Sequence, residues 1–219
     1  MASNQPDGYL ALPPDDTGPG VLVLHAWWGL NATIKTVCDL LAESGYVAFA
    51  PDLYHGQLAD TIPDAEALGS ALDANYLQAK AEIAEAARFL DARSGQPGSG
   101  LAVIGFSLGA FYALDLATAD PERIRAVVVF YGTGVEDHSN SRAAYLGHFA
   151  GNDPYEPSAN VDGLEESLKR AGRPVTIYRY PDTGHWFFEP DVTAAYDEAA
   201  ADLAWERTLA FLKENASRS

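Results

Sequence analysis

Short apolar runs separated by helix-length amphipathic stretches constrain the fold of this chain most. Runs such as residues 21–25 and 101–104 have the length and the Val, Ile and Leu content of buried strands, and residues 75–93 form a long Ala-, Leu- and Glu-rich stretch with one apolar side. The expected strands are residues 21–25, 46–50, 101–104, 126–131, 145–150 and 175–180, and the expected helices are residues 33–44, 75–93, 161–171 and 193–214, with another starting at about residue 110. Strands that alternate with helices predict βαβ units and a mainly parallel sheet with helices on both faces.

The chain shows no internal repeat, low-complexity tract or dividing linker, so residues 1–219 are expected to form one α/β domain. Residues 53–70 are polar and punctuated by Pro and Gly, which favours a loop with room for one short helix. We therefore expect a minimal cap, and whether this segment closes over a site stays open.

The charge balance excludes several classes of partner. The 31 acidic residues against 14 basic ones give a formal net charge of −17, which repels nucleic-acid phosphates and anionic lipid headgroups. The first seven residues have neither a basic start nor an apolar core, and no run approaches the ~20 apolar residues of a membrane span. We expect a cytoplasmic protein with no nucleic-acid or membrane partner. Solubility and a high-salt habitat both remain open as reasons for the acidity, and the oligomeric state is undetermined.

The single cysteine, Cys38, rules out an internal disulfide and a multi-cysteine metal site. It lies in the apolar register of the helix expected over residues 33–44, which predicts a buried structural thiol.

The pentapeptide Gly105-Phe106-Ser107-Leu108-Gly109 lies between an expected strand and an expected helix. Strand, Gly-x-Ser-x-Gly and helix is the context of a nucleophile elbow, in which the serine Oγ is exposed at a strained turn. Taken alone, however, such a pentapeptide after a buried strand more often forms only an ordinary tight turn.

A serine hydroxyl needs a base, and His185 is the candidate because it follows the expected strand at residues 175–180. The other four histidines are interpreted differently: His148 as structural, His55 and His138 as solvent-exposed, and His25 as a residue that shapes its loop.

The imidazole in turn needs a carboxylate, and Asp153 follows a strand between the serine and the histidine. The order Ser107, Asp153, His185 is typical of α/β-hydrolases. Asp182 and Asp137 are weaker candidates, the first because it lies three residues before the histidine and can bond its own turn.

Two backbone N–H groups are candidates for an oxyanion hole, those of Leu108 and Trp27, with the Ala26 N–H as a close alternative. Gly29 would let the chain bend over the site. We expect five side chains to line a substrate pocket: Ala26, Trp28, Tyr54, Tyr131 and Trp186, with Tyr54 and Tyr131 able to donate a hydrogen bond.

With these features, the chain resembles the dienelactone hydrolase family of α/β-hydrolases from about residue 21 to residue 212. The resemblance is carried by residues 25–31 (HAWWGLN), 50–54 (APDLY), 105–109 (GFSLG), 151–154 (GNDP), 184–188 (GHWFF) and 204–212 (AWERTLAFL). It implies the α/β-hydrolase fold and hydrolysis of carboxylic esters or lactones.

The chain departs from the pattern of the best-known members of that family. Those members use cysteine at the elbow with a glutamate in the first loop, where this chain has Ser107 and Ala26. They also hold the lactone carboxylate with two arginines, where this chain has His55-Gly56-Gln57 and Glu189. The family's chemistry is therefore expected, but its anionic substrate is not.

These features predict a serine hydrolase that cleaves a small ester or lactone through an acyl-enzyme and requires no metal or cofactor. A thioesterase or perhydrolase with the same triad is the alternative among enzymes, and a non-catalytic relative that binds a small ligand is the alternative outside them.

Overall fold

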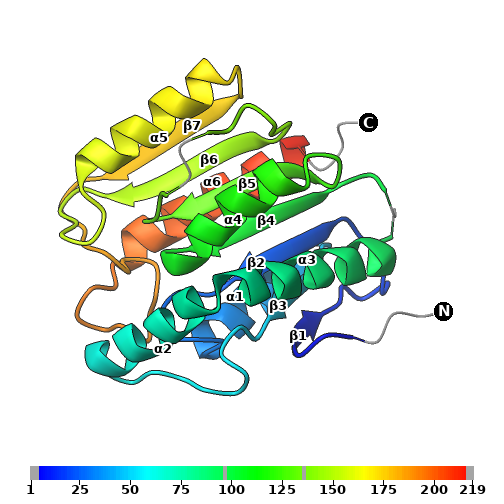
Figure 1. Ribbon diagram of the computed structural model, residues 1–219, viewed down its shortest axis with the longest axis horizontal. Coiled ribbons are helices and arrows are strands. Elements are labelled where there is room, and N and C mark those ends of the chain that lie inside the picture. Colours follow the sequence, from blue (N-terminus) through cyan, green and yellow to red (C-terminus); the bar gives the residue numbers. More distant parts are fainter. Residues whose placement is uncertain (1–4, 96–97, 135–136, 216–219) are drawn as a thin grey trace.

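The computed structural model describes residues 5–95, 98–134 and 137–215, which fold around one seven-stranded sheet (Figure 1). The strand order is β1-β3-β2-β4-β5-β6-β7; β1 pairs antiparallel with β3, and every other pair is parallel. The strands are β1 (Gly8–Ala11), β2 (Gly20–Leu24), β3 (Val47–Pro51), β4 (Leu101–Phe106), β5 (Ile124–Phe130), β6 (Ala144–Ala150) and β7 (Val175–Tyr180). The carboxyl ends of the parallel strands therefore lie at one edge of the sheet, where such folds carry their sites.

Helices cover both faces of the sheet. They are α1 (Ala32–Glu43), α2 (Ile62–Ala74), α3 (Tyr76–Arg93), α4 (Leu108–Ala119), α5 (Ser158–Arg170) and α6 (Glu198–Asn215). Buried residues of α3, α4 and α5 pack on one face, and those of α1 and α6 pack on the other. The predicted α/β-hydrolase architecture, with a mainly parallel sheet between two helical layers, is confirmed.

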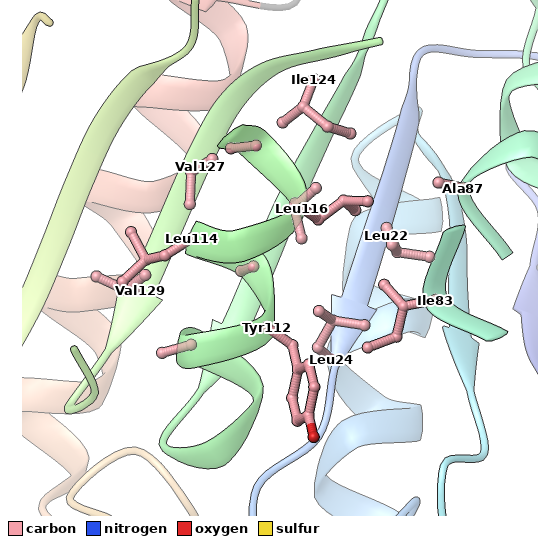
Figure 2. Packing of buried hydrophobic residues seen from close by; sticks show 14 of the residues in the cluster. Leu22, Leu24, Ile83, Ala87, Tyr112, Leu114, Leu116, Ile124, Val127 and Val129 are labelled. Carbon is pink, nitrogen blue, oxygen red and sulfur yellow. The ribbon is translucent and has the colours of Figure 1, made fainter. Parts of the chain in front are cut away.

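The larger core cluster joins β2, α3 and α4 near the predicted elbow. Figure 2 shows Leu22 and Leu24 of β2 beside Ile83 of α3, while the ring of Tyr112 on α4 lies beside Leu24 close to the carboxyl end of that strand. All four are buried. This packing holds α4, whose first residue Leu108 directly follows Ser107, against the sheet.

The sequence prediction missed β1 and placed the start of the last helix incorrectly. β1 is a four-residue edge strand of three half-buried residues and the buried Ala11, too short to show a clear alternation. The last helix begins at Glu198, five residues later than expected. The residue before it, Asp197, acts as a helix cap, because its Oδ1 accepts a hydrogen bond from Ala200 N–H. Residues 193–195 instead form a turn, and residues 196–197 have no regular secondary structure.

The segment predicted as loop, residues 53–70, contains most of α2, a helix of 13 residues. The Thr61 hydroxyl accepts a hydrogen bond from Asp64 N–H and donates one to the Asp64 carboxylate, so the helix has a side-chain cap. Ala65, Gly69 and Leu72 share its buried side. In Figure 1, α2 lies at the end of the sheet where loop 181–197 is found.

Candidate active site

Ser107 lies in a strained turn between β4 and α4. Its φ is 49° and its ψ is −111°, a conformation that non-glycine residues rarely adopt. The Ser107 N–H donates to the carbonyl of Phe130 at the end of β5, at 2.9 Å. The Gly-x-Ser-x-Gly segment thus has the geometry of a nucleophile elbow, with strain held by the neighbouring strand.

The start of α4 approaches the end of β2 more closely than a side chain would allow. A Cβ on Gly109 would lie 2.3 Å from the carbonyl oxygen of Leu24 and 2.7 Å from that of His25. Leu108 is the first residue of α4, so its N–H has no acceptor within the helix and lies at the positive end of the helix dipole. The close approach brings this N–H beside the loop that carries Trp27, the second candidate donor.

Ser107, His185 and Asp153 form a hydrogen-bonded chain. Ser107 Oγ lies 2.9 Å from His185 Nε2, and His185 Nδ1 lies 2.7 Å from Asp153 Oδ2. The side chains of His185 and Asp153 are 5% and 3% exposed, so little water competes for the bond between them. These are the residues, and the order, that the sequence predicted for a triad.

Asp153 is held by its own loop. Its Oδ1 accepts hydrogen bonds from the N–H groups of Tyr155 and Glu156, both at 2.9 Å, which leaves Oδ2 for the imidazole. Of the two rival carboxylates, Asp182 is exposed and Asp137 bonds Ser139 N–H within its own turn. The structure therefore brings Asp153, and neither rival, to His185.

His25 holds the loop after β2 in place through two hydrogen bonds. Its Nδ1 donates to the Ala26 carbonyl at 2.8 Å, and its Nε2 accepts from Leu53 N–H at 3.3 Å. Burial lowers the pKa of His25, which keeps the ring neutral as this arrangement requires. His25 thus shapes the loop, and Gly29, with φ of 84°, lets the chain turn back after Trp28.

Aromatic rings surround the His185 side chain. The Trp28 and Trp186 rings lie 5.2 Å apart, and Trp186 lies 4.8 Å from the imidazole. Tyr155, which the sequence analysis missed, lies 5.2 Å from His185, 4.9 Å from Trp186 and 6.0 Å from Trp27. It lies two residues after Asp153, and this proximity was the one available signal. Gly69 of α2 packs on Trp27, where a Cβ would lie 3.1 Å from the indole nitrogen.

The interpretation of Tyr131 as a hydrogen-bond donor to substrate was wrong. Its hydroxyl is fully buried and donates to Glu189 Oε1 at 2.7 Å, while its ring lies 4.9 Å from His185. Glu189 stands at one of the two positions where the best-known family members carry arginine. It is also fully buried, so it presents no acidic group to the surface of the site. Tyr131 therefore supports the imidazole with its ring.

Two other predicted pocket residues are covered. Ala26 is buried in the loop after β2, and Tyr54 is buried with its ring edge-on to His25 at 4.8 Å. Burial raises the pKa of Tyr54, so its hydroxyl stays protonated. Ala26 is thus an interior part of this loop, and Tyr54 supports the loop through its contact with His25.

The remaining histidines lie outside the triad. His148 is buried in β6, where it bonds Tyr180 Oη and Thr208 Oγ1, and burial lowers its pKa to about 3. His55 is largely exposed, 3.7 Å from Glu82. His138 was expected in solvent but is fully buried, with its ring 5.7 Å from that of Tyr145, because the loop folds back onto β6.

Cys38 is buried, as predicted, and burial raises its pKa. Over the ranges that the structure describes, no group of three His, Cys, Asp or Glu side chains could hold a metal ion. None of the helices in those ranges is long and apolar enough to cross a membrane.

The parallel sheet, the elbow and the hydrogen-bonded Ser, His and Asp define an α/β-hydrolase. Residues 7–216 match the model of the dienelactone hydrolase family, and the chain belongs to that family. This membership makes it a carboxylic ester hydrolase.

Relatives match the chain over almost its whole length. It is 34% identical to "Protein usf" of Aquifex pyrophilus and 31% identical to a "Putative carboxymethylenebutenolidase" of Aquifex aeolicus, in both cases over 94% of this chain and 92% of the relative. Among solved structures, a "Putative Dienelactone Hydrolase" from Klebsiella pneumoniae superposes with a TM-score of 0.81 at 28% identity, covering 94% of this chain and 92% of the other.

Proposed function

We propose that this chain is a serine hydrolase that cleaves ester or lactone bonds of small, uncharged substrates through an acyl-enzyme. The observation that carries the proposal is the continuous hydrogen-bonded chain from Ser107 Oγ through His185 to Asp153 Oδ2. The residues act in the order in which they are connected.

In the first half-reaction, His185 Nε2 accepts the Ser107 proton as Oγ attacks the carbonyl carbon. Asp153 stabilises the imidazolium that forms, and its two backbone hydrogen bonds keep its oxygen in place. The N–H groups of Leu108 and Trp27 stabilise the negative charge on the carbonyl oxygen. His185 then donates its proton to the leaving alcohol as the carbon–oxygen bond breaks.

In the second half-reaction, His185 takes a proton from water, which attacks the acyl carbon. The tetrahedral intermediate collapses, Ser107 Oγ leaves and recovers the proton from His185, and the acid is released. Every step uses side chains and backbone groups of this chain.

The surroundings of the triad favour uncharged substrates. The rings of Tyr155 and Trp186 lie next to the imidazole, and the ring of Trp27 lies next to that of Tyr155. An apolar wall of this kind holds an ester better than a carboxylate. At the two places where the best-known relatives carry arginine, this chain has exposed His55 with its neighbours and buried Glu189. We therefore infer that an anionic dienelactone is a poor substrate.

A substrate panel tests the proposal. Wild type and the Ser107→Ala variant should be assayed with 4-nitrophenyl acetate and butyrate, a neutral γ-lactone, an anionic enol-lactone and an acyl thioester. We expect the neutral esters or the lactone to have the highest kcat/KM, with turnover lost in the variant. A Ser107→Ala variant that keeps wild-type turnover would refute the mechanism, and a preference for the thioester or the anionic lactone would refute the substrate class.

A further inference from the structure

Glu189 and Tyr131 form a buried pair behind the catalytic histidine. Both side chains are fully buried, and the Tyr131 hydroxyl donates to Glu189 Oε1 at 2.7 Å. Burial raises the pKa of Glu189 to about 8, so the pair is mostly neutral at pH 7 and avoids the cost of a buried charge.

The pair connects the two halves of the site. Glu189 lies four residues after His185, in a turn closed by a hydrogen bond from its own N–H to the Trp186 carbonyl. Tyr131 directly follows Phe130, whose carbonyl accepts the hydrogen bond from Ser107 N–H. A continuous path therefore runs from the backbone of the serine, through Tyr131 and Glu189, to the loop that carries the histidine.

Tyr131 also touches the imidazole directly. Its ring centroid lies 4.9 Å from that of His185, and its φ of 38° is a conformation that needs outside support. The hydroxyl is the one polar atom of this side chain, and Glu189 holds it. The position of the ring, and so one wall of the imidazole, depends on that hydrogen bond.

Glu189 Oε2 is buried and makes no hydrogen bond to any residue within the described ranges. The carboxyl group therefore contributes one hydrogen bond in exchange for burying two polar oxygens, which a residue chosen for core packing alone would not require. This imbalance favours a role in the site.

We propose that Glu189 is a positioning residue for the reaction, which holds Tyr131 against His185 and so keeps His185 Nε2 within hydrogen-bonding distance of Ser107 Oγ. This inference rests on the proposed role of His185 as the base. Glu189 does not touch the substrate, so its effect falls on kcat and leaves KM unchanged.

Three variants test the inference, with 4-nitrophenyl acetate as substrate. Glu189→Leu and Tyr131→Phe each remove the hydrogen bond, and we expect kcat to fall by about 10- to 100-fold with KM within about twofold of wild type, because small displacements of a catalytic group have effects of this size. Glu189→Gln keeps an acceptor oxygen for Tyr131 and should restore most of the rate. The double variant Tyr131→Phe/Glu189→Leu should be no slower than the slower single variant. Glu206→Leu, which removes an exposed carboxylate on α6, is the matched control and should keep wild-type kcat.

Circular dichroism establishes that each variant is folded before kcat is compared. Folded Glu189→Leu and Tyr131→Phe variants with wild-type kcat would overturn the inference, as would a Glu189→Gln variant as slow as Glu189→Leu. If Ser107→Ala is inactive while Glu189→Leu is fully active, the positioning role fails and the proposed function stands. If Ser107→Ala is as active as wild type, both fail.

Discussion

His185 Nε2 lies 2.9 Å from Ser107 Oγ, although 78 residues separate the two in the chain. The serine is placed by the turn between β4 and α4, and the histidine by the loop after β7. Since β4 and β7 are not neighbours in the sheet, the distance depends on the loops around the site as well as on the strands.

Asp153→Asn should lower kcat by roughly 10³- to 10⁴-fold, because an amide donating to His185 Nδ1 would favour the wrong tautomer. Steady-state assays with 4-nitrophenyl acetate measure this effect. Asp182→Asn is the matched control, since Asp182 is an exposed carboxylate on the loop of His185, and it should keep nearly full activity. If kcat fell more in Asp182→Asn than in Asp153→Asn, the carboxylate that pairs with His185 would be Asp182, which would contradict the proposed role of Asp153.

Tyr155→Ala should raise KM for 4-nitrophenyl esters by about 3- to 10-fold with a smaller change in kcat, because it removes an aromatic wall worth about 1 kcal/mol. The triad should persist, since the Asp153 carboxylate is held by the backbone N–H of residue 155. Tyr155→Phe keeps the ring and serves as control. If KM were unchanged in Tyr155→Ala, Tyr155 would not contribute to substrate binding.

Gly109→Ala should lose both stability and activity, because the added Cβ would lie 2.3 Å from the Leu24 carbonyl and would push α4 away from β2. Overpacking of this kind costs about 1–3 kcal/mol. The comparison is Gly163→Ala, at an exposed position of α5 where a Cβ meets nothing within 4 Å. That change should stabilise the helix by up to about 1 kcal/mol. Urea unfolding measures both variants, and equal effects would contradict the close approach.

The raised pKa of Glu189 should make the free energy of unfolding depend on pH between pH 6.5 and 9. Burial raises its pKa in the folded state to about 8, above the ordinary glutamate value of 4.5, so the folded state holds a proton that the unfolded state has released. Stability therefore falls as pH rises through 8, by at most about 1.4 kcal/mol for each pH unit. The charged or titratable groups facing the carboxyl are Tyr131 and Asp191.

Glu189→Gln carries no titrating proton and should be less sensitive to pH than wild type over this range. The free energy of unfolding from urea titrations at pH 6.5 and 9 provides the comparison. Buried His148, with a pKa of about 3, contributes its pH dependence below pH 6.5 and does not interfere. Parallel pH profiles for the two proteins would contradict a buried, neutral Glu189.

The parts of the fold with strong local signals were predictable from the sequence. The central strands are continuous apolar runs, and their order with the intervening helices is enough to specify a parallel sheet. β1 was missed because its three half-buried residues and one buried residue carry little pattern. α2 was expected to be a short helix at most, because Pro63 and Gly69 resemble loop residues. The Thr61 cap was the available signal for α2.

The hydrogen-bonded arrangement of Ser107, His185 and Asp153 was predictable because each residue follows a strand or lies at the elbow motif. The partners that hold it were not, because they depend on tertiary contacts. Glu189 and Tyr131 are 58 residues apart, and no local pattern indicates that their side chains meet in the core. Burial of His138 was missed for the same reason, since its loop is polar in sequence.

Covalent labelling tests the proposed role of Ser107 as the nucleophile activated by His185. Folded wild-type protein should be incubated with a fluorophosphonate, and intact-mass and peptide analysis should locate the adduct. We expect one phosphonyl group per chain, on Ser107, with labelling abolished in Ser107→Ala and strongly slowed in His185→Ala. No adduct on folded wild-type protein, or an adduct on another residue, would contradict it.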